Sequence, residues 1–267
     1  MNGHLTLRDF SIAIGLVLIW VFFALVSDHF LSPRNLSMLA IELAVTATLA
    51  LGMLLVLLPG MIDLSVGSGV GLIGGIASVL VFEHHVPALA AMMLALILAV
   101  VIWALMGKLI VGQRIPAFII TLGGLLVFKG AFWLTIHNST IPVSEGNSAN
   151  LYALLTTYYF PEWMGFAMFA ITGVLLVWAR VRARRQRQAH GFAVEDFEIE
   201  FLKAFIGLQA LLLLVIVLNS FRGVPLSVVI LALVALLVYG VTQHTPFGRY
   251  LYAIGDNQEA AVLSGIP

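Results

Sequence analysis

Long apolar segments alternate with short polar connections along the whole of this chain. Each apolar segment is close to the length that a helix needs to cross about 30 Å of hydrocarbon. Because such segments recur from one end to the other, they are not a signal peptide. The pattern predicts an all-α fold, a polytopic transmembrane helix bundle in one domain over residues 1–267. The eight segments cover residues 10–28, 36–58, 65–82, 87–107, 115–135, 163–180, 201–219 and 225–242.

Composition and charge agree with a membrane protein and exclude several other classes. Hydrophobic residues make up 61% of the chain and charged residues only 10%. The net charge is zero, and the basic residues form only one short cluster, so we expect no nucleic-acid partner. The chain has no cysteine, which excludes a disulfide framework and a thiolate metal site. No set of His, Asp and Glu has ligand spacing, so we expect neither a metal site nor a catalytic site.

The basic residues also predict how the chain is oriented in the membrane. If the N-terminus is cytoplasmic, simple alternation of the segments places most of the 13 Lys and Arg residues on the same side. The exceptions are Arg34, Lys129 and Arg222. Cytoplasmic loops carry an excess of Lys and Arg, so we expect a cytoplasmic N-terminus.

Two connections are longer than the others. Residues 136–162 form the longest outer loop and end in an aromatic run, Tyr158 to Trp163, typical of the membrane interface. This loop is either a solvated connection with membrane anchors or a docking surface for a soluble binding protein. Residues 181–200 form a charged cytoplasmic loop that changes from arginines to acidic residues. A solvated, self-neutralising linker explains this second loop.

The connection between the second and third apolar segments, residues 58–69, contains helix-breaking and acidic residues at membrane depth. Non-helical backbone is tolerated there only where protein or a water-filled cavity surrounds it, and transporters line their pathways with broken helices. Asp63 or Ser65 is alternatively the cap of the next helix. The two interpretations are compatible, because a capping residue can also line a gate. The candidate gate residues in this region are Gly60, Asp63, Ser65 and Gly67.

Two further features belong to the same candidate pathway. Gly67, Gly71 and Gly75 repeat at four-residue spacing, which indicates a close helix-packing face first and a pathway wall second. Glu42, within the second segment, and Thr121, within the fifth, are the other polar candidates. Glu42 either bonds the backbone or a neighbour such as Thr46 or Thr48, or receives a sugar hydroxyl. Neutral sugars need hydrogen-bonding groups rather than a counter-charge, which fits the scarcity of buried charges.

The polar segment 244–267 predicts a short capped helix. Asp256 followed by Glu259 has the spacing of a capping box, so we expect a helix that starts at Asn257 and stops at Gly265, with Gly265 in the left-handed conformation. Two alanines give this helix a thin face that suits insertion into a cleft on a partner. The residues of this segment that we expect to act are Gly248, Arg249, Gly255, Asp256, Asn257, Glu259, Ala260, Ala261 and Gly265.

Three strings together resemble the monosaccharide branch of ABC importer permeases, above all its xylose-type members. They are residues 60–67 (GMIDLSVG), residues 116–123 (PAFIITLG) and the loop 248–265, and the resemblance spans essentially the whole chain. It implies a multi-pass permease subunit of the bacterial cytoplasmic (inner) membrane, which is not itself an enzyme. It also implies a homodimer in contact with membrane lipid, a periplasmic sugar-binding protein and cytoplasmic ABC ATPase subunits. The segment 244–267 would be the coupling loop to those ATPases.

The resemblance assigns ATP and Mg to the partner subunits, and this chain has no cofactor of its own. The sequence agrees, because it contains no Gly-x-x-x-x-Gly-Lys-Ser/Thr phosphate loop. Family members have about ten spans, so we expect the chain to be incomplete at its C-terminus. The charged insertion 181–200 is not typical of ribose-type members. An ion-coupled secondary sugar transporter is the alternative, because intramembrane acids such as Glu42 and Asp63 are functional candidates by default.

Overall fold

A computed structural model describes residues 11–141 and 150–266, and nearly all of its regular structure is helical. The all-α prediction is therefore confirmed. The chain divides into two compact units, one made of Met1–Glu42 with Tyr159–Pro225 and the other of Leu43–Tyr158 with Leu226–Pro267. Each of the eight apolar segments contains one helix. Six of these helices are long and apolar enough to cross a membrane, whereas α1 (Ser11–Val26) and α3 (Val66–Phe82) are shorter apolar helices.

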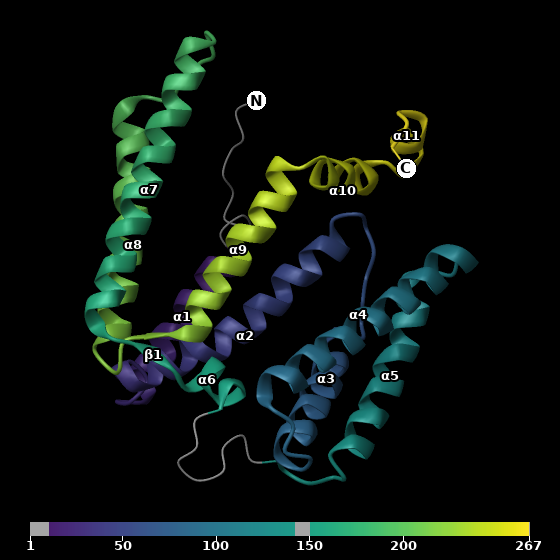
Figure 1. Ribbon diagram of the computed structural model, residues 1–267. Coiled ribbons are helices and arrows are strands. Elements are labelled where there is room, and N and C mark those ends of the chain that lie inside the picture. Colours follow the sequence, from purple (N-terminus) through teal and green to yellow (C-terminus); the bar gives the residue numbers. More distant parts are fainter. Residues whose placement is uncertain (1–10, 142–149, 267) are drawn as a thin grey trace. The chain divides into compact units, whose positions relative to one another are not determined.

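The first unit is built around a long helical hairpin. Figure 1 shows α7 (Glu162–Ala189) and α8 (Phe197–Asn219) side by side. At one end of the hairpin, β1 (Tyr159–Phe160) pairs antiparallel with β2 (Val224–Pro225). The Asn219 side chain donates a hydrogen bond to the carbonyl of Glu162, at 3.1 Å. This unit also contains α1 and the first part of α2 (Pro33–Leu57).

The other end of the hairpin differs from the sequence prediction. The apolar segment was expected to stop at residue 180, but α7 continues to Ala189, so all of the arginines expected in the 181–200 loop lie on a helix instead. Lys203 bonds both carboxylate oxygens of Glu195, at 2.6 and 2.8 Å. This hydrogen bond and the charge of Lys203 lower the pKa of Glu195 below its ordinary value of 4.5. The pair therefore stabilises this turn at neutral pH, and its contribution is lost as the pH falls through the lowered pKa.

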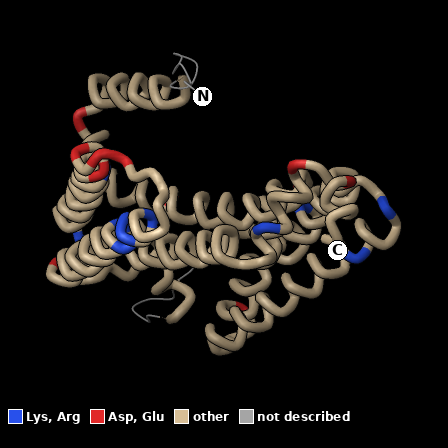
Figure 2. The backbone as a smooth tube through the Cα atoms, turned by 90° about the horizontal axis from the view of Figure 1, so that it is seen from above, with Lys and Arg blue, Asp and Glu red and all other residues tan. Residues whose placement is uncertain are grey.

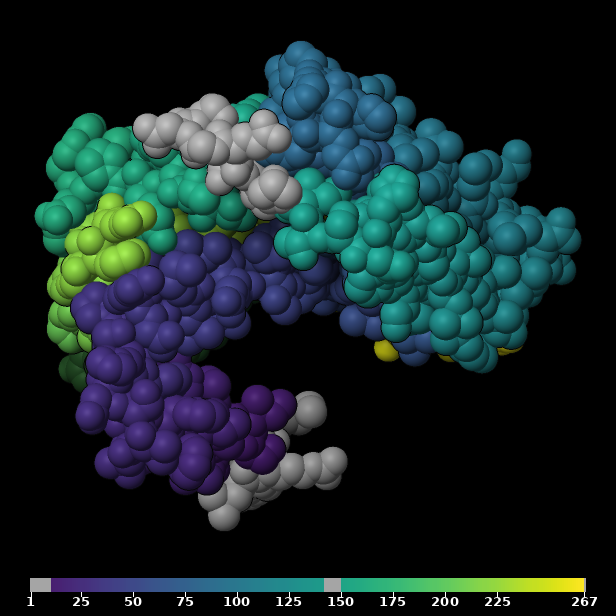
Figure 3. Space-filling model, turned by 90° about the horizontal axis from the view of Figure 1, so that it is seen from below, coloured from purple at the N-terminus to yellow at the C-terminus, as the bar shows by residue number. Residues whose placement is uncertain are grey.

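In the second unit, three helices surround the broken segment. The helix α3 packs against both α4 (Ala88–Gln113) and α5 (Ala117–Thr135). In the space-filling view of Figure 3, these three helices, blue to teal, form one continuous body. The Trp103 and Phe128 rings lie 5.4 Å apart between α4 and α5. The short α6 (Leu151–Thr157) contacts α4 and α9 (Leu226–His244).

The second unit ends in two short helices. After α9 the chain turns into α10 (Pro246–Asp256), which Figure 1 draws at a steep angle to α9, and then into α11 (Gln258–Leu263). The side chain of Thr245 caps α10 by accepting the N–H of Gly248, at 3.2 Å, and Pro246 occupies the first turn. The sequence had predicted a helix only from residue 257 onward, so α10 was missed. Figure 2 shows long stretches of the chain without charge and the charged residues gathered in a few places.

Candidate functional site

The broken segment between α2 and α3 forms a buried polar cluster in the second unit. The helix α2 ends where Gly60 adopts a positive φ of 81°, and Met61 N–H donates back to the carbonyl of Val56, at 3.3 Å. This is the left-handed helix termination for which glycine is suited. The chain then runs without regular structure until α3 begins at Val66. The break predicted from the sequence is confirmed.

Asp63 is the centre of this cluster. Its Oδ1 accepts the N–H of Ser65, at 2.8 Å, and the hydroxyl of Ser65, at 2.6 Å. Its Oδ2 accepts the indole N–H of Trp103, from α4, at 3.0 Å. Both Asp63 and Ser65 are buried. Ser65 stands at the N-cap position but makes no side-chain cap. Asp63 accepts the N–H of Ser65 itself, a local side-chain to backbone bond that fixes the turn into α3.

The fifth helix closes the cluster from the other side. The buried Thr121 hydroxyl lies 3.3 Å from the carbonyl of Ile62 and 3.3 Å from the carbonyl of Phe118. A Cβ added at Gly124 would lie 3.3 Å from the Cβ of Ser65, so this glycine lets α5 approach the start of α3. The structure thus brings together three predicted residues: Asp63, Ser65 and Thr121. Trp103 was not among the predicted residues, because one tryptophan in an apolar helix gives no signal of its partner.

The predicted glycine face of α3 is wrong in part. A Cβ added at Gly67 would meet nothing within 4 Å, whereas one at Gly69 would lie 2.3 Å from the Trp103 ring. A Cβ at Gly75 would lie 3.0 Å from the Phe132 ring, and one at Gly71 would only touch the same ring, at 3.9 Å. The close-packing positions are therefore Gly69 and Gly75. The four-residue spacing predicted Gly75 but not Gly69, because α5 packs against α3 at Gly75 and Trp103 of α4 packs against it at Gly69.

The remaining pathway candidate lies apart from this cluster along the chain. Glu42 is exposed on α2. The hydroxyl of Thr48, one of its expected partners, donates to the carbonyl of Ala44 at 2.7 Å. Glu42 stays a pathway candidate because of its position in an apolar helix.

The C-terminal helix α11 is capped at both ends, with one correction to the sequence prediction. Its N-cap is Asn257, whose Oδ1 accepts the N–H of Ala260 at 3.0 Å, whereas Asp256 is the last residue of α10. The predicted capping box is therefore wrong by one residue, because the longer α10 takes up Asp256. At the other end Gly265 has a φ of 80°, and Ile266 N–H bonds the carbonyl of Ala261 at 3.0 Å. The predicted left-handed Gly265 is confirmed.

At two glycines, α10 packs closely against the backbone of other segments. A Cβ added at Gly255 would lie 1.9 Å from the carbonyl oxygen of Leu58, and one at Gly248 would lie 2.1 Å from that of Thr242. The first contact joins α10 to the turn that follows α2 and leads into the Asp63 cluster. On α11, Glu259 and Ala260 are exposed and Ala261 is buried, and Arg249 is exposed on α10. The C-terminal segment thus has an exposed face and a backbone contact with the broken segment.

Comparison with known proteins places this arrangement in a transport family. Residues 35–267 match the family described as branched-chain amino acid transport system / permease component. The xylose transport system permease protein XylH of Escherichia coli (strain K12) is 35% identical over 269 residues, which cover 98% of this chain and 66% of that protein. The protein of the same name from Haemophilus influenzae is 32% identical over 263 residues, or 97% of this chain and 68% of that protein.

A ribose permease matches over a similar part of the chain. The ribose import permease protein RbsC of Escherichia coli (strain K12) is 28% identical over 253 residues, 95% of this chain and 60% of that protein. No solved structure matches the chain significantly. The chain thus spans 66% of the length of the xylose relative from Escherichia coli. The resemblance drawn from the three strings is confirmed, and the chain belongs to the branched-chain amino acid transport system / permease component family, a family of transport permeases rather than enzymes.

Proposed function

We propose that this protein is the membrane-spanning permease subunit of an ATP-driven importer, which passes a monosaccharide, D-xylose, from a periplasmic binding protein into the cytoplasm. The observation that carries the proposal is the seat of α10 against the carbonyl of Leu58. Through this contact, a displacement of the C-terminal segment reaches the turn that leads into the buried Asp63 cluster. The identity to two xylose permeases supports the choice of sugar.

The coupling element of this proposal is residues 244–267. The exposed Glu259 and Ala260 on α11 insert into a cleft of a cytoplasmic ABC ATPase subunit, in which ATP and Mg are bound. The small side chain of Ala260 permits a close approach, whereas Ala261 is buried. The capped ends keep α11 helical when the ATPase displaces it. The contacts of Gly248 and Gly255 with backbone then transmit this displacement more directly than flexible side chains would.

The gate of this proposal is the Asp63 cluster. Its bonds tie the broken segment to α4 through Trp103 and to α5 through Thr121. A buried polar network has a few discrete hydrogen-bonded arrangements rather than a continuum, so it suits a two-state gate. Gly60 supplies the turn on one side, and the open space beside Gly67 leaves room on the other. Neutral hydroxyls of a sugar would exchange hydrogen bonds with Ser65 or Asp63, and Glu42 would act elsewhere along the pathway.

The same family membership supports the assembly that we propose. The chain 1–267 is one transmembrane domain of a homodimer in the bacterial cytoplasmic membrane, surrounded by lipid and with its N-terminus in the cytoplasm. The binding protein docks on residues 136–162, of which 142–149 lie outside the described residues. Within this loop, α6 is capped by Asn150, whose side chain accepts the N–H of Ala153 at 2.8 Å. An ordered helix in the loop favours a docking surface.

The direct test is D-xylose uptake into membrane vesicles that carry the native-length protein, its ATPase partner and its binding protein. We expect uptake with ATP on the ATPase side, and none when either ATP or the binding protein is omitted. An imposed proton gradient without ATP should give no uptake. Uptake driven by the gradient alone would instead identify an ion-coupled secondary transporter, with Glu42 and Asp63 as its candidate proton sites. Competition by ribose and arabinose then establishes the sugar.

A further inference from the structure

The arginines at the end of α7 lie on two different faces of the helix. Successive residues turn by about 100°, so positions 180, 184 and 187 share one face, and positions 178, 182, 185 and 189 share another. The first face meets α8, where Arg184 bonds Glu200 at 2.5 Å. The ion pairs recorded among the described residues are this one and Lys203 with Glu195. On the first face, Arg184 is therefore paired with Glu200 of α8, whereas Arg182 and Arg185 have no recorded carboxylate partner among the described residues.

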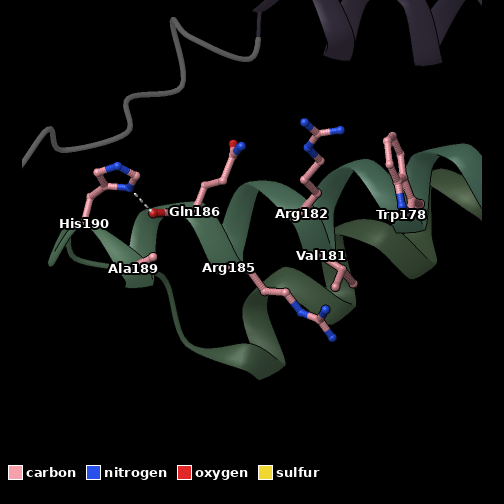
Figure 4. A pocket seen from close by; sticks show the side chains of 7 residues that line it. All are labelled: Trp178, Val181, Arg182, Arg185, Gln186, Ala189 and His190. Carbon is pink, nitrogen blue, oxygen red and sulfur yellow. Dashed lines mark hydrogen bonds between the residues drawn. The ribbon is translucent and has the colours of Figure 1, made fainter.

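Arg182 and Arg185 line a small cavity along α7. Figure 4 shows Trp178, Arg182 and Gln186 projecting from one side of the helix and Arg185 extending from another. The guanidinium of Arg182 lies 5.2 Å from the centre of the Trp178 ring, and the ring of His190 is held by a 2.8 Å contact between its Nδ1 and the carbonyl of Gln186. The cavity has a volume of about 330 Å³. Two cations therefore line it from different sides, Arg182 beside the amide of Gln186 and Arg185 opposite them.

This polar cavity continues into an apolar groove. The groove, of about 640 Å³, runs along α7 beside α8. Phe169, Gly173, Val174 and Val177 line it from α7, and Leu208 lines it from α8. Trp178, Val181 and Arg185 line both spaces. A Cβ added at Gly173 would lie 3.2 Å from the Leu208 side chain, so this glycine keeps the floor of the groove close to α8. The combined site is apolar along its length and cationic at one end.

The cationic end lies at the depth of lipid headgroups. From Trp163 to Trp178, α7 contains no charged residue, a length of about 24 Å at 1.5 Å per residue. Arg182 then follows about 6 Å beyond Trp178 and Arg185 about 10 Å beyond it, measured along the helix axis. Headgroup regions occupy several ångströms on each side of the hydrocarbon, and tryptophan marks the boundary. The two arginines are therefore placed where phosphates of the bilayer lie.

We propose that the Arg182–Arg185 end of this groove binds the phosphate of an anionic phospholipid, one of whose acyl chains lies in the groove between α7 and α8. Charge selects the headgroup, since juxtamembrane arginines attract anionic lipids, and the apolar groove selects a lipid over free phosphate or an acidic peptide. In the proposed transport function, lipid only surrounds the protein. This site is a specific one, and it does not depend on which solute the protein carries.

The test is a binding titration of the delipidated, native-length protein in neutral detergent. Bound lipids are counted by native mass spectrometry with phosphatidylglycerol or phosphatidylcholine as the probe. We expect phosphatidylglycerol to bind more tightly than phosphatidylcholine. The double variant Arg182→Gln/Arg185→Gln should lose on the order of tenfold in affinity for phosphatidylglycerol. The variant Arg182→Lys/Arg185→Lys, which keeps both charges, should retain most of it.

The matched control is Lys108→Gln/Arg114→Gln, which removes two exposed cations from the end of α4 and leaves the groove unchanged. We expect a change of less than about threefold, because these residues contribute only to the general charge. An equal loss in both double variants, an absence of preference for phosphatidylglycerol, or displacement of it by millimolar inorganic phosphate would overturn the proposal. Circular dichroism of each variant checks that the helices are intact.

Discussion

At the scale of single residues, the central feature is one buried carboxyl group with three hydrogen-bond donors around it. The indole N–H of Trp103 is the donor that comes from another helix. In Trp103→Phe the ring remains to pack on Phe128, but Asp63 loses this partner. Leaving a buried acceptor without its bond costs about 1 to 3 kcal/mol. We expect a lower thermal unfolding midpoint of the purified protein and slower uptake.

The control for this change is Trp133→Phe, on the neighbouring helix α5. Trp133 is 46% exposed, whereas Trp103 is partly covered by its neighbours. The control should shift the midpoint much less than Trp103→Phe. Equal shifts would show that the loss of the larger ring, and not the bond to Asp63, determines the effect.

The second residue-scale prediction compares two glycines on the same helix. Gly69→Ala places a methyl group 2.3 Å from a Trp103 ring that is held by its bond to Asp63, and such overpacking costs about 1 to 3 kcal/mol. Gly67→Ala meets nothing within 4 Å and should stabilise α3 by up to about 1 kcal/mol. Thermal unfolding of the two variants measures both. The opposite order would contradict the packing described for α3.

At the scale of elements, the capping of α11 corrects the sequence prediction and can be checked locally. Asn257→Ala removes the bond to Ala260 N–H and should destabilise the helix by about 1 kcal/mol. Asp256→Ala removes no cap and should change stability by less than about 0.5 kcal/mol. Hydrogen exchange of residues 258–264 reports this difference as several-fold faster exchange in the first variant alone. Faster exchange in Asp256→Ala would show that Asp256 caps α11, as the capping box predicts.

The seat of α10 makes the next prediction at this scale. In Gly255→Ala the new Cβ collides with the Leu58 carbonyl, and backbone cannot move aside as a flexible side chain can. We expect ATP-driven uptake to fall on the order of tenfold, a coupling loss of about 1.4 kcal/mol, with the protein still inserted in the membrane. Gly240→Ala on α9, where nothing lies within 4 Å, is the matched control. Normal uptake in Gly255→Ala would show that this contact transmits nothing.

The elements themselves were only partly predictable. Apolar runs predicted all eight apolar helices, six long and two shorter, because crossing hydrocarbon requires length and hydrophobicity whatever the packing. The extension of α7 to Ala189 was missed because arginine is a good helix former even outside the membrane. The ion pair of Arg184 with Glu200 could not be predicted either, because Glu200 lies on another helix. The helix α10 was missed because its start depends on a hydrogen bond from Gly248 N–H to the Thr245 side chain. The sequence around Thr245 is equally typical of a turn.

At the scale of the whole molecule, the family was predictable and the polar cluster was not. Three strings in a fixed order identify a transport permease, and the comparisons confirm it. That Asp63, Ser65 and Thr121 meet could not be derived, because their proximity depends on how α3, α4 and α5 pack. The same holds for Trp103 and for the contact between Gly255 and Leu58. Patterns along a chain report local periodicity, whereas these contacts join residues far apart in sequence.

Site-specific crosslinking of α11 tests whether this helix contacts the ATPase subunit. Because the chain has no cysteine, Glu259→Cys introduces a single thiol on an exposed face of this helix, and Glu83→Cys introduces one after α3, on the opposite side of the membrane by the predicted topology. We expect the thiol at position 259 to crosslink to the ATPase subunit in native membranes and to resist an impermeant thiol reagent added from outside. The thiol at position 83 should do the reverse. Labelling of position 259 from outside, without a crosslink to the ATPase, would contradict the account.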